Sequence, residues 1–206
     1  MYICAFNILF QMKKITLLLM SVLASGYAFA QTDTSGRNFY RATPEKKTAL
    51  RHTKLKVDFN FSNQTLNGEE WLTAAPFFYP SDSLILDAKT MLIHQVALDQ
   101  QGKLQNLPYI YRDDLLRIKL PKKYQKDENY TVYIKYTAQP EKVPNNGNLS
   151  ISDTKGLYFI NPEGKPEGYP RQIWTQGEAE SSSCWFPTID KPNQKTTQEI
   201  EMTVPD

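Results

Sequence analysis

The chain has 206 residues, 40% of them hydrophobic and 12% aromatic, and carries a formal net charge of +2 at pH 7. This length fits one domain with a substantial core, and plentiful Tyr and Phe favour sheet over helical bundle. Lys13 and Lys14 belong to a predicted leader, and 24 basic residues less these two leaves 22 against 22 acidic ones. Nucleic-acid binding requires clustered positive charge, which this overall balance does not offer.

The N-terminal segment has the pattern of a secretory signal peptide. Lys13 and Lys14 precede an apolar run at residues 15–24, and Ala28 and Ala30 then form an A-x-A cleavage site. The run is too short to span a bilayer comfortably, and no stop-transfer segment follows it.

The sequence therefore predicts a signal peptide over residues 1–30, with the true start at Met12 and cleavage before Gln31. The mature protein is expected to be exported to the periplasm or outside of a bacterial cell. No contact with a membrane is expected after cleavage, and no nucleic-acid partner.

Cysteine usage excludes a disulfide framework. Cys4 leaves with the leader, so Cys184 is the only cysteine of the predicted mature chain. Its neighbours Trp185 and Phe186 favour a small buried side chain over a reactive thiol, which would need a nearby cation.

Residues 31–49 are predicted to form a flexible lead-in that contains a short helix. Thr43 and Pro44 suit the cap and first position of that helix, which would extend at most to Leu50. The folded domain is expected to occupy residues 50–206.

Strand patterning dominates the chain from there. Residues 54–61 alternate strictly, which predicts one face in the core and one in water. Further strands are expected, in chain order, at residues 70–79, 84–86, 91–98, 115–120, 130–136, 156–160 and 199–204. Asn63-Gln64 and Asn67-Gly68 offer turn chemistry. The acidic pairs Glu69-Glu70 and Asp113-Asp114 are expected on the solvated surface.

Turns separate these runs at short, regular intervals, which predicts an all-β fold, either an antiparallel sandwich or an open barrel. Residues 138–170 form a long loop-rich connection, of a kind that is more often functional than idle. The last predicted strand has no later strand to pair with, and we expect the polypeptide to be C-terminally incomplete.

Few groups suited to catalysis are visible in the sequence. His52 and His94 lie far apart, and packing or surface placement explains each better than a shared metal site. The sequence contains no H-E-x-x-H, no C-x-x-C, no calcium loop, no glycine-rich phosphate loop and no G-x-S-x-G elbow. We expect this chain to bind no metal and to contain no catalytic residue.

The most informative stretch is TQGEAESSSCWFPTIDKP at residues 175–192. Its TQGEA at 175–179, FPTIDKP at 186–192 and KTT at 195–197 resemble the N-terminal domain of the aminopeptidase N family, which are zinc-dependent exopeptidases. In that family, TQ-x-E-A is followed by FP-x-x-D-x-P and a further strand.

Weaker matches occur in the same order. They are HTKL at residues 52–55, LNG at 66–68, LDAK at 86–89 and GLY at 156–158. The resemblance thus covers residues 50–206, and several short motifs in register are far more specific than any one of them.

This resemblance implies a saddle-like β domain that packs on a separate catalytic domain, which supplies the zinc and its ligands. Carried over to this sequence, Glu178 would bind the free α-ammonium group of a peptide, and Gln176 would assist. Gly177 would let the backbone approach closely. Ser183 and Cys184 stand where the family often has Arg, and Lys191 where it often has Glu.

Three functions remain open at this point. The chain is the substrate-edge domain of an exported zinc aminopeptidase and is inactive alone, or it is a stand-alone exported β-sandwich that binds a ligand without catalysis. The third, hydrolysis by this chain unaided, needs a nucleophile that the sequence does not reveal. The side-chain preference of the parent enzyme is not determined by these residues.

Overall fold

The computed structural model describes residues 44–144, 154–165, 168–178 and 180–204, and the predicted leader lies outside them. Residues from Glu45 onward form one compact unit. Its elements are β1 (Thr48–Asn60), β2 (Thr65–Pro76), β3 (Ser81–Asp87), β4 (Met91–Gln100), β5 (Lys103–Asn106), β6 (Tyr109–Arg112), β7 (Leu115–Tyr124), β8 (Tyr130–Ala138), β9 (Leu157–Ile160), β10 (Gln172–Thr175) and β11 (Thr197–Thr203), with 3-10 turns η1 (Pro140–Lys142) and η2 (Ser182–Cys184).

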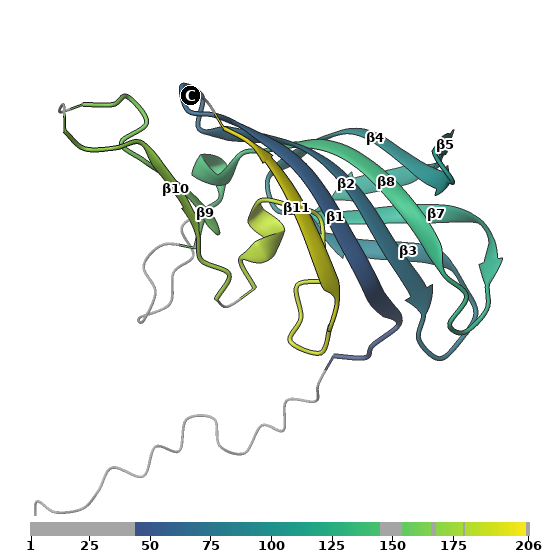
Figure 1. Ribbon diagram of the computed structural model, residues 1–206. Helices are drawn as coiled ribbons and strands as arrows, with labels where there is room; N and C mark the ends of the chain where they lie inside the picture. The colour runs from purple at the N-terminus through teal and green to yellow at the C-terminus, as the bar shows by residue number, and fades with distance from the viewer. Residues whose placement is uncertain (1–43, 145–153, 166–167, 179, 205–206) are drawn as a thin grey trace, which may run out of the picture. The chain divides into compact units, whose positions relative to one another are not determined.

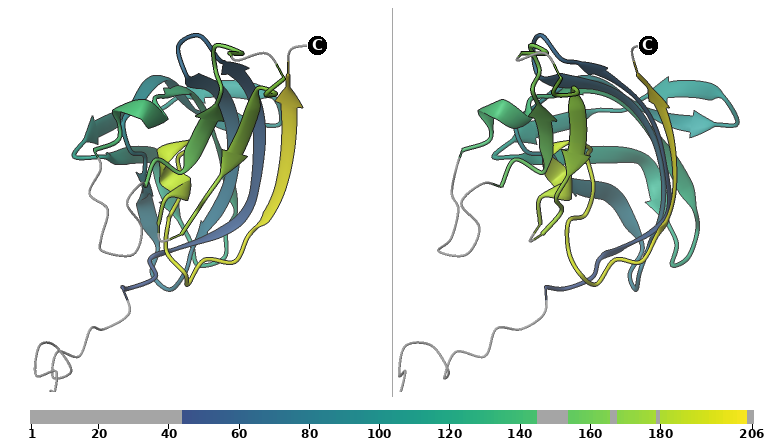
Figure 2. Two further views of the ribbon diagram at one scale, coloured as in Figure 1. Left: turned by 90° about the vertical axis from the view of Figure 1, so that its left-hand side faces the viewer. Right: turned by 60° about the vertical axis from the view of Figure 1, so that its left-hand side comes forward.

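The predicted all-β fold is confirmed. The strands form a six-stranded sheet in the order β11-β1-β2-β8-β4-β5, a three-stranded sheet β3-β7-β6 and the hairpin β10-β9 (Figure 1). The long sheet is strongly curved, and the β9–β10 hairpin lies on its inner side (Figure 2). The arrangement is open, because each sheet ends in free edge strands.

The core fills the space between the inner face of the long sheet and the smaller sheet. As predicted, alternate residues of β1 and β8 are buried, among them Leu55, Val57, Val132 and Ile134. They join the inward side chains of β3 and β7 in one hydrophobic cluster. Buried and exposed side chains thus alternate along each strand because only one face of the sheet is covered by the core.

One strand pair departs from the antiparallel prediction. β11 runs parallel to β1, with Leu55 opposite Ile200 and Val57 opposite Met202. The chain reaches β11 beside the start of β1, where the side chain of Gln194 accepts a hydrogen bond from the backbone N–H of Leu50 at 3.2 Å. A chain arriving at that end can only continue in the direction of β1.

The predicted helix up to Leu50 is wrong. Residues 44–47 have no regular structure, and Thr48, Ala49 and Leu50 already belong to β1, where all three are buried. A helix of two turns has too few hydrogen bonds to offset its nucleation cost, whereas strand pairing with residues 74–76 buries these side chains at once.

Asn67 and Gly68, predicted to make a turn, instead lie inside β2. The β1–β2 turn occupies residues 61–64, and Gln64 adopts a positive φ of 51° there. Gly68 is required by packing, since an added Cβ would lie 2.2 Å from the ring of Tyr136. The strands β5, β6 and β10 were not predicted, because four residues carry little periodicity.

The prediction for the first acidic pair is half wrong, because Glu70 is fully buried. Every second residue of a strand points to the same face, and Glu70 therefore lies on the covered face of β2 with Leu66, Gly68 and Leu72. Among the described residues, neither Glu70 carboxylate oxygen has a hydrogen-bond partner. Burial therefore raises the pKa of this carboxyl well above its ordinary value.

We expect Glu70→Leu to stabilise the fold. It removes two unpartnered buried oxygens, which should raise the free energy of unfolding at neutral pH by about 1–3 kcal/mol. A raised folded-state pKa also makes the wild type less stable as pH rises above the ordinary carboxyl pKa, with a slope approaching about 1.4 kcal/mol per pH unit until the raised pKa is passed. The gain should therefore be larger at pH 8 than at pH 4, as measured by urea unfolding.

Glu69→Leu is the matched control. Glu69 lies on the outer face, where its carboxylate is 3.6 Å from the ammonium group of Lys135. An exposed pair of this kind contributes little, so the control should change stability by less than about 0.5 kcal/mol. A destabilised Glu70→Leu protein at pH 8 would contradict the account of Glu70.

Candidate functional site

The predicted site residues follow directly on β10. The backbone N–H of Gln176 donates to the carbonyl of Gly156 at 3.0 Å, which continues the hairpin register by one residue. Gln176 is half-buried and Glu178 is exposed. The Gln176 amide nitrogen lies 3.4 Å from a carboxylate oxygen of Glu178, so the structure brings the two side chains together.

The two acids of this loop differ in their surroundings. Glu180 forms an ion pair with Lys191 at 2.6 Å, and its backbone carbonyl accepts a hydrogen bond from Lys89. Glu178 forms no ion pair with any residue that the structure describes. Among the described residues its carboxylate accepts one side-chain hydrogen bond, from the neutral amide of Gln176. Glu178 is therefore the carboxylate available to an incoming cation.

The loop after Glu178 is tied to the sandwich through β3. Asp87 and Thr188 exchange two backbone hydrogen bonds of 2.7 and 2.9 Å as an isolated bridge. The Asp87 carboxylate also accepts the backbone N–H of Asp190 at 2.9 Å, and the Asp190 carboxylate accepts that of Ser183. The matched motifs LDAK and FPTIDKP thus meet in space, a hundred residues apart in sequence.

Two further features hold this loop in place. Gly156 has a φ of +74°, and a Cβ there would lie 2.0 Å from the carbonyl oxygen of Ser181. Cys184 is buried, as predicted, and burial raises the pKa of its thiol to about 11. Its sulfur contacts the carbonyl of Thr154 at 3.4 Å, so this thiol is structural.

Gly177, predicted to allow close backbone approach, has a more modest role. A Cβ at this position would meet the hydroxyl of Ser182 at 3.1 Å, a tight contact with a side chain that can rotate. The carbonyl of Gly177 accepts the N–H of Ser181 at 3.0 Å, which closes the turn that carries Glu178.

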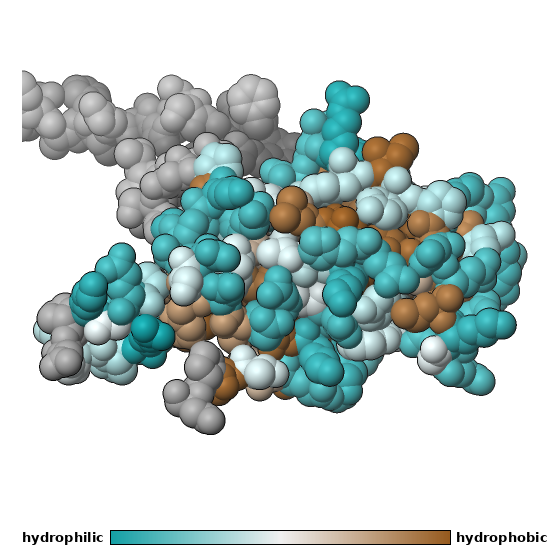
Figure 3. Space-filling model, turned by 90° about the horizontal axis from the view of Figure 1, so that it is seen from above, coloured by the Kyte–Doolittle hydropathy of each residue, from teal (hydrophilic) through white to brown (hydrophobic). Residues whose placement is uncertain are grey.

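An apolar groove of about 620 Å³ begins one residue before Gln176. It runs between the β9–β10 hairpin and the ends of β1 and β11, and neither Gln176 nor Glu178 lines it. Figure 3 shows hydrophobic side chains exposed in patches among hydrophilic ones. The lining residues are Phe59, Phe61, Leu157, Arg171, Ile173, Trp174, Thr175, Trp185, Met202 and Val204.

The groove continues along the inward face of β11. Ile200 and Met202 lie in register with Leu55 and Val57, which are buried in the core. Yet Met202 is 58% exposed and Val204 64% exposed. The apolar inner face of the long sheet therefore extends one strand beyond the side chains that cover it in the described chain.

The residues present do not fit a zinc site. His52 bonds the hydroxyl of Thr197 at 2.8 Å, and His94 bonds that of Thr137 at 2.9 Å. They lie on β1 and β4, which β2 and β8 separate. Within the described ranges, no three His, Cys, Asp or Glu side chains come together in a way that suits a metal. Nor does any described helix have the length and apolar character of a membrane span.

Several of these features were not found from the sequence. The roles of Asp87 and Asp190 as anchors were missed, although both stood in the matched motifs. The apolar groove was missed because it joins residues from β1, β9, β10 and β11, and in the sequence only the apolar alternation of Ile200, Met202 and Val204 pointed to it. Lys191, which stands where the family often has Glu, pairs with Glu180.

Comparison with known proteins gives a consistent match. A family model described as the peptidase M1 N-terminal domain matches residues 47–206. Among curated proteins, transcription initiation factor TFIID subunit 2 of Danio rerio is 24% identical over 174 residues, which is 70% of this chain and 14% of that protein.

Solved structures share the fold. The M1 zinc metallopeptidase of Deinococcus radiodurans has a TM-score of 0.61 at 16% identity, over 81% of this chain and 35% of that one. A variant of it bound to a Tyr-Ser-Ala substrate gives 0.62 at 17% identity, with the same coverage. Yeast LTA4 hydrolase gives 0.57 at 21% identity, over 83% and 26%. The chain thus spans about a third or less of these proteins.

Gly156→Ala is expected to dislodge the loop that carries Glu178. The positive φ and the clash with the carbonyl oxygen of Ser181 act together, and the loss of unfolding free energy should be roughly 3 kcal/mol or more. Urea unfolding followed by Trp fluorescence measures this loss.

Gly102→Ala separates the two causes. Gly102 has a φ of +89°, but nothing lies within 4 Å of an added Cβ. This variant should lose only about 1 kcal/mol, the cost of the left-handed conformation. Equal losses at the two positions would show that the contact with Ser181 does not hold the loop.

Proposed function

The chain belongs to the family of peptidase M1 N-terminal domains, and from this we propose that it is the substrate-edge β domain of an exported zinc aminopeptidase. In this proposal Gln176 and Glu178 receive the free amino end of a peptide. A second domain supplies the zinc and its ligands, and the reaction is the removal of N-terminal amino acids from peptides. The match over residues 47–206 is the observation that carries the proposal.

The electrostatics of the loop support this role for Glu178. An α-ammonium group and a carboxylate form a charge-assisted hydrogen bond, about twice as strong as a neutral one. Glu178 has no cation partner among the described residues, so binding an ammonium would not require breaking an existing ion pair. A substrate with a blocked amino end cannot make this bond, which would select free N-termini. Fixing that end also positions the first peptide carbonyl.

The apolar groove supports a second domain. Its exposed Trp174, Met202 and Val204 form a contiguous apolar surface of the kind that marks an interaction site. A domain seated on it would lie next to Thr175 and hence beside Gln176 and Glu178. A solved neighbour bound to a Tyr-Ser-Ala substrate accords with peptides as the substrate class.

A stand-alone exported binding module is the second candidate. The curated relative is named a transcription initiation factor subunit, so membership in this domain family does not by itself imply peptidase activity. In that case the groove would bind a ligand without catalysis. The nucleotide sequence after the codon for Asp206 separates the two: a frame that continues into an H-E-x-x-H segment supports the aminopeptidase, and a stop codon supports the module.

The purified chain is expected to hydrolyse no amino-acid p-nitroanilide, with or without added zinc, because the described residues contain no group that fits the metal. Release of p-nitroaniline is measured by absorbance, with an unrelated zinc aminopeptidase as the positive control. Zinc-dependent turnover by this chain alone would overturn the division of labour proposed here.

In an enzyme that joins this chain to the zinc domain, Glu178→Gln should weaken the use of free peptides. Losing a charge-assisted bond to the substrate ammonium should lower kcat/KM by roughly 10- to 100-fold for substrates with a free amino end. The residual activity on an N-acetylated substrate should not change. Steady-state kinetics on the matched pair of substrates provides the measurement.

Glu180→Gln is the control for that experiment. Glu180 lies two residues away but is already paired with Lys191, so it should leave kcat/KM within about twofold of wild type. If Glu180→Gln lowers kcat/KM as much as Glu178→Gln does, the assignment of Glu178 to the substrate ammonium is wrong.

A further inference from the structure

Exposed aromatic side chains occupy the connection between β2 and β3, which we term the aromatic tip (residues 77–80). Phe78 is 62% exposed and Tyr79 is 77% exposed. The Phe78 ring contacts Phe77 at a centroid distance of 4.4 Å, edge to face. Two adjacent large aromatics held in solvent at one loop end are unusual for a surface with no partner.

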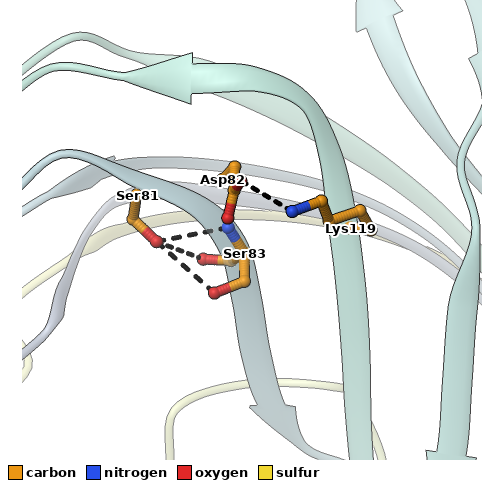
Figure 4. A network of polar contacts seen from close by, with 4 residues as sticks. All are labelled: Ser81, Asp82, Ser83 and Lys119. Atoms are coloured by element: carbon orange, nitrogen blue, oxygen red, sulfur yellow. Dashed lines mark hydrogen bonds and ion pairs between the residues drawn. The ribbon is translucent and has the colours of Figure 1, made fainter.

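The aromatic tip is held firmly at both ends. The backbone N–H of Phe77 donates to the carbonyl of Lys47 at 2.9 Å. At the start of β3 the Ser81 hydroxyl bonds the backbone N–H and carbonyl of Ser83, and Asp82 pairs with Lys119 of β7 at 2.6 Å (Figure 4). The exposed rings are therefore presented by an ordered base.

Cations surround the aromatic tip. The Lys46 ammonium lies 4.9 Å from the centre of the Phe77 ring, and that of Lys126 lies 5.9 Å from the Phe78 ring. The turn between β7 and β8 is joined to the tip, because the N–H of Asp127 donates to the carbonyl of Pro76. This end of the domain collects seven cations, Lys46, Lys47, Arg51, Lys119, Lys122, Lys123 and Lys126, against four carboxylates, Glu45, Asp82, Asp127 and Glu128.

Each of those carboxylates is already paired. Arg51 pairs with Asp127, Lys119 with Asp82, Lys122 with Glu128, and Lys47 with Glu45 at 3.6 Å. Lys46, Lys123 and Lys126 form no ion pair with a described residue. The chain is near neutrality as a whole, yet this end carries three uncompensated positive charges around two exposed rings.

We propose that the aromatic tip and its lysines form a contact surface for an anionic lipid bilayer. Aromatic rings settle at the interface between headgroups and acyl chains, and nearby lysines bind anionic headgroups. The combination fits a lipid surface better than a nucleic acid, which needs a longer basic track. Contact of this kind needs no membrane span, but it departs from the expectation, drawn from the sequence, that the mature chain contacts no membrane.

A second copy of this chain is a poorer occupant. A symmetric contact would bring two clusters of uncompensated lysines face to face, and like charges oppose such an association. An anionic bilayer meets the same charges with complementary ones. Dimerisation through this end is therefore an outcome that the experiment should exclude.

The test is sedimentation of the whole chain with lipid vesicles. The protein should sediment with phosphatidylcholine vesicles that contain phosphatidylglycerol and stay in solution with phosphatidylcholine alone. Raising the salt concentration from about 0.1 M to about 0.5 M should release most of it, because screening weakens the attraction of lysines to headgroups. Light scattering without lipid reports the oligomeric state.

Two variants and their controls locate the contact. Tyr79→Ala and Lys126→Glu should each weaken binding at least about fivefold, since each removes an interfacial ring or reverses a charge. Tyr169→Ala removes a comparably exposed ring elsewhere, and Lys103→Glu reverses a lysine that forms no ion pair with the described part of the chain. Both variants should bind as wild type does.

The proposal is wrong if the wild type does not sediment with anionic vesicles, or if Tyr79→Ala and Lys126→Glu bind the vesicles as well as their controls do. Vesicle binding caused by the apolar N-terminal residues would be common to all variants and would produce the second of these results. The proposal would also be wrong if the wild type formed a dimer without lipid and Tyr79→Ala were a monomer.

Discussion

The loop that carries the candidate site depends on one set of hydrogen bonds at the end of β3. Asp87 bonds Thr188 through its backbone and Asp190 through its carboxylate, and Asp190 in turn holds Ser183. The connection from β10 to β11 has almost no regular structure. These bonds fix the middle of the connection, and the hydrogen bond of Gln176 to Gly156 fixes the part next to Glu178. Backbone groups in such a loop need partners of this kind.

The sequence predicted the fold well wherever a pattern extends over many residues. The alternation in β1 and β8 identified both the strands and the core, because one covered face dictates every second side chain. The prediction was wrong where a local preference competes with strand pairing. Leu50 was predicted to be helical and Gly68 to lie in a turn, but both lie in strands. Both residues take their conformation from strands distant in sequence, which no local window contains.

The candidate site was predictable only in part, for a related reason. The choice of Gln176 and Glu178 as site residues rested on the resemblance to a family. Which acidic residue of this loop has an ion-pair partner cannot be predicted from composition. Among the residues that the structure describes, Glu180 has an ion-pair partner and Glu178 has none, because Lys191 folds back beside Glu180. The same holds for Glu70, whose burial follows from strand parity. The net charge of the chain likewise does not show that uncompensated lysines gather around the aromatic tip.

The apolar groove and the aromatic tip lie at opposite ends of β1. Phe59 and Phe61 of the groove are at the end of that strand. Lys46 and Lys47, which lie beside the aromatic tip, precede its start. The 13 residues of β1 that lie between them have a length of about 40 Å along the strand. In the proposed arrangement, a zinc domain on the groove would contact the end of β1 that is opposite to the aromatic tip. The proposed catalytic partner and the proposed lipid surface thus use different ends of the domain.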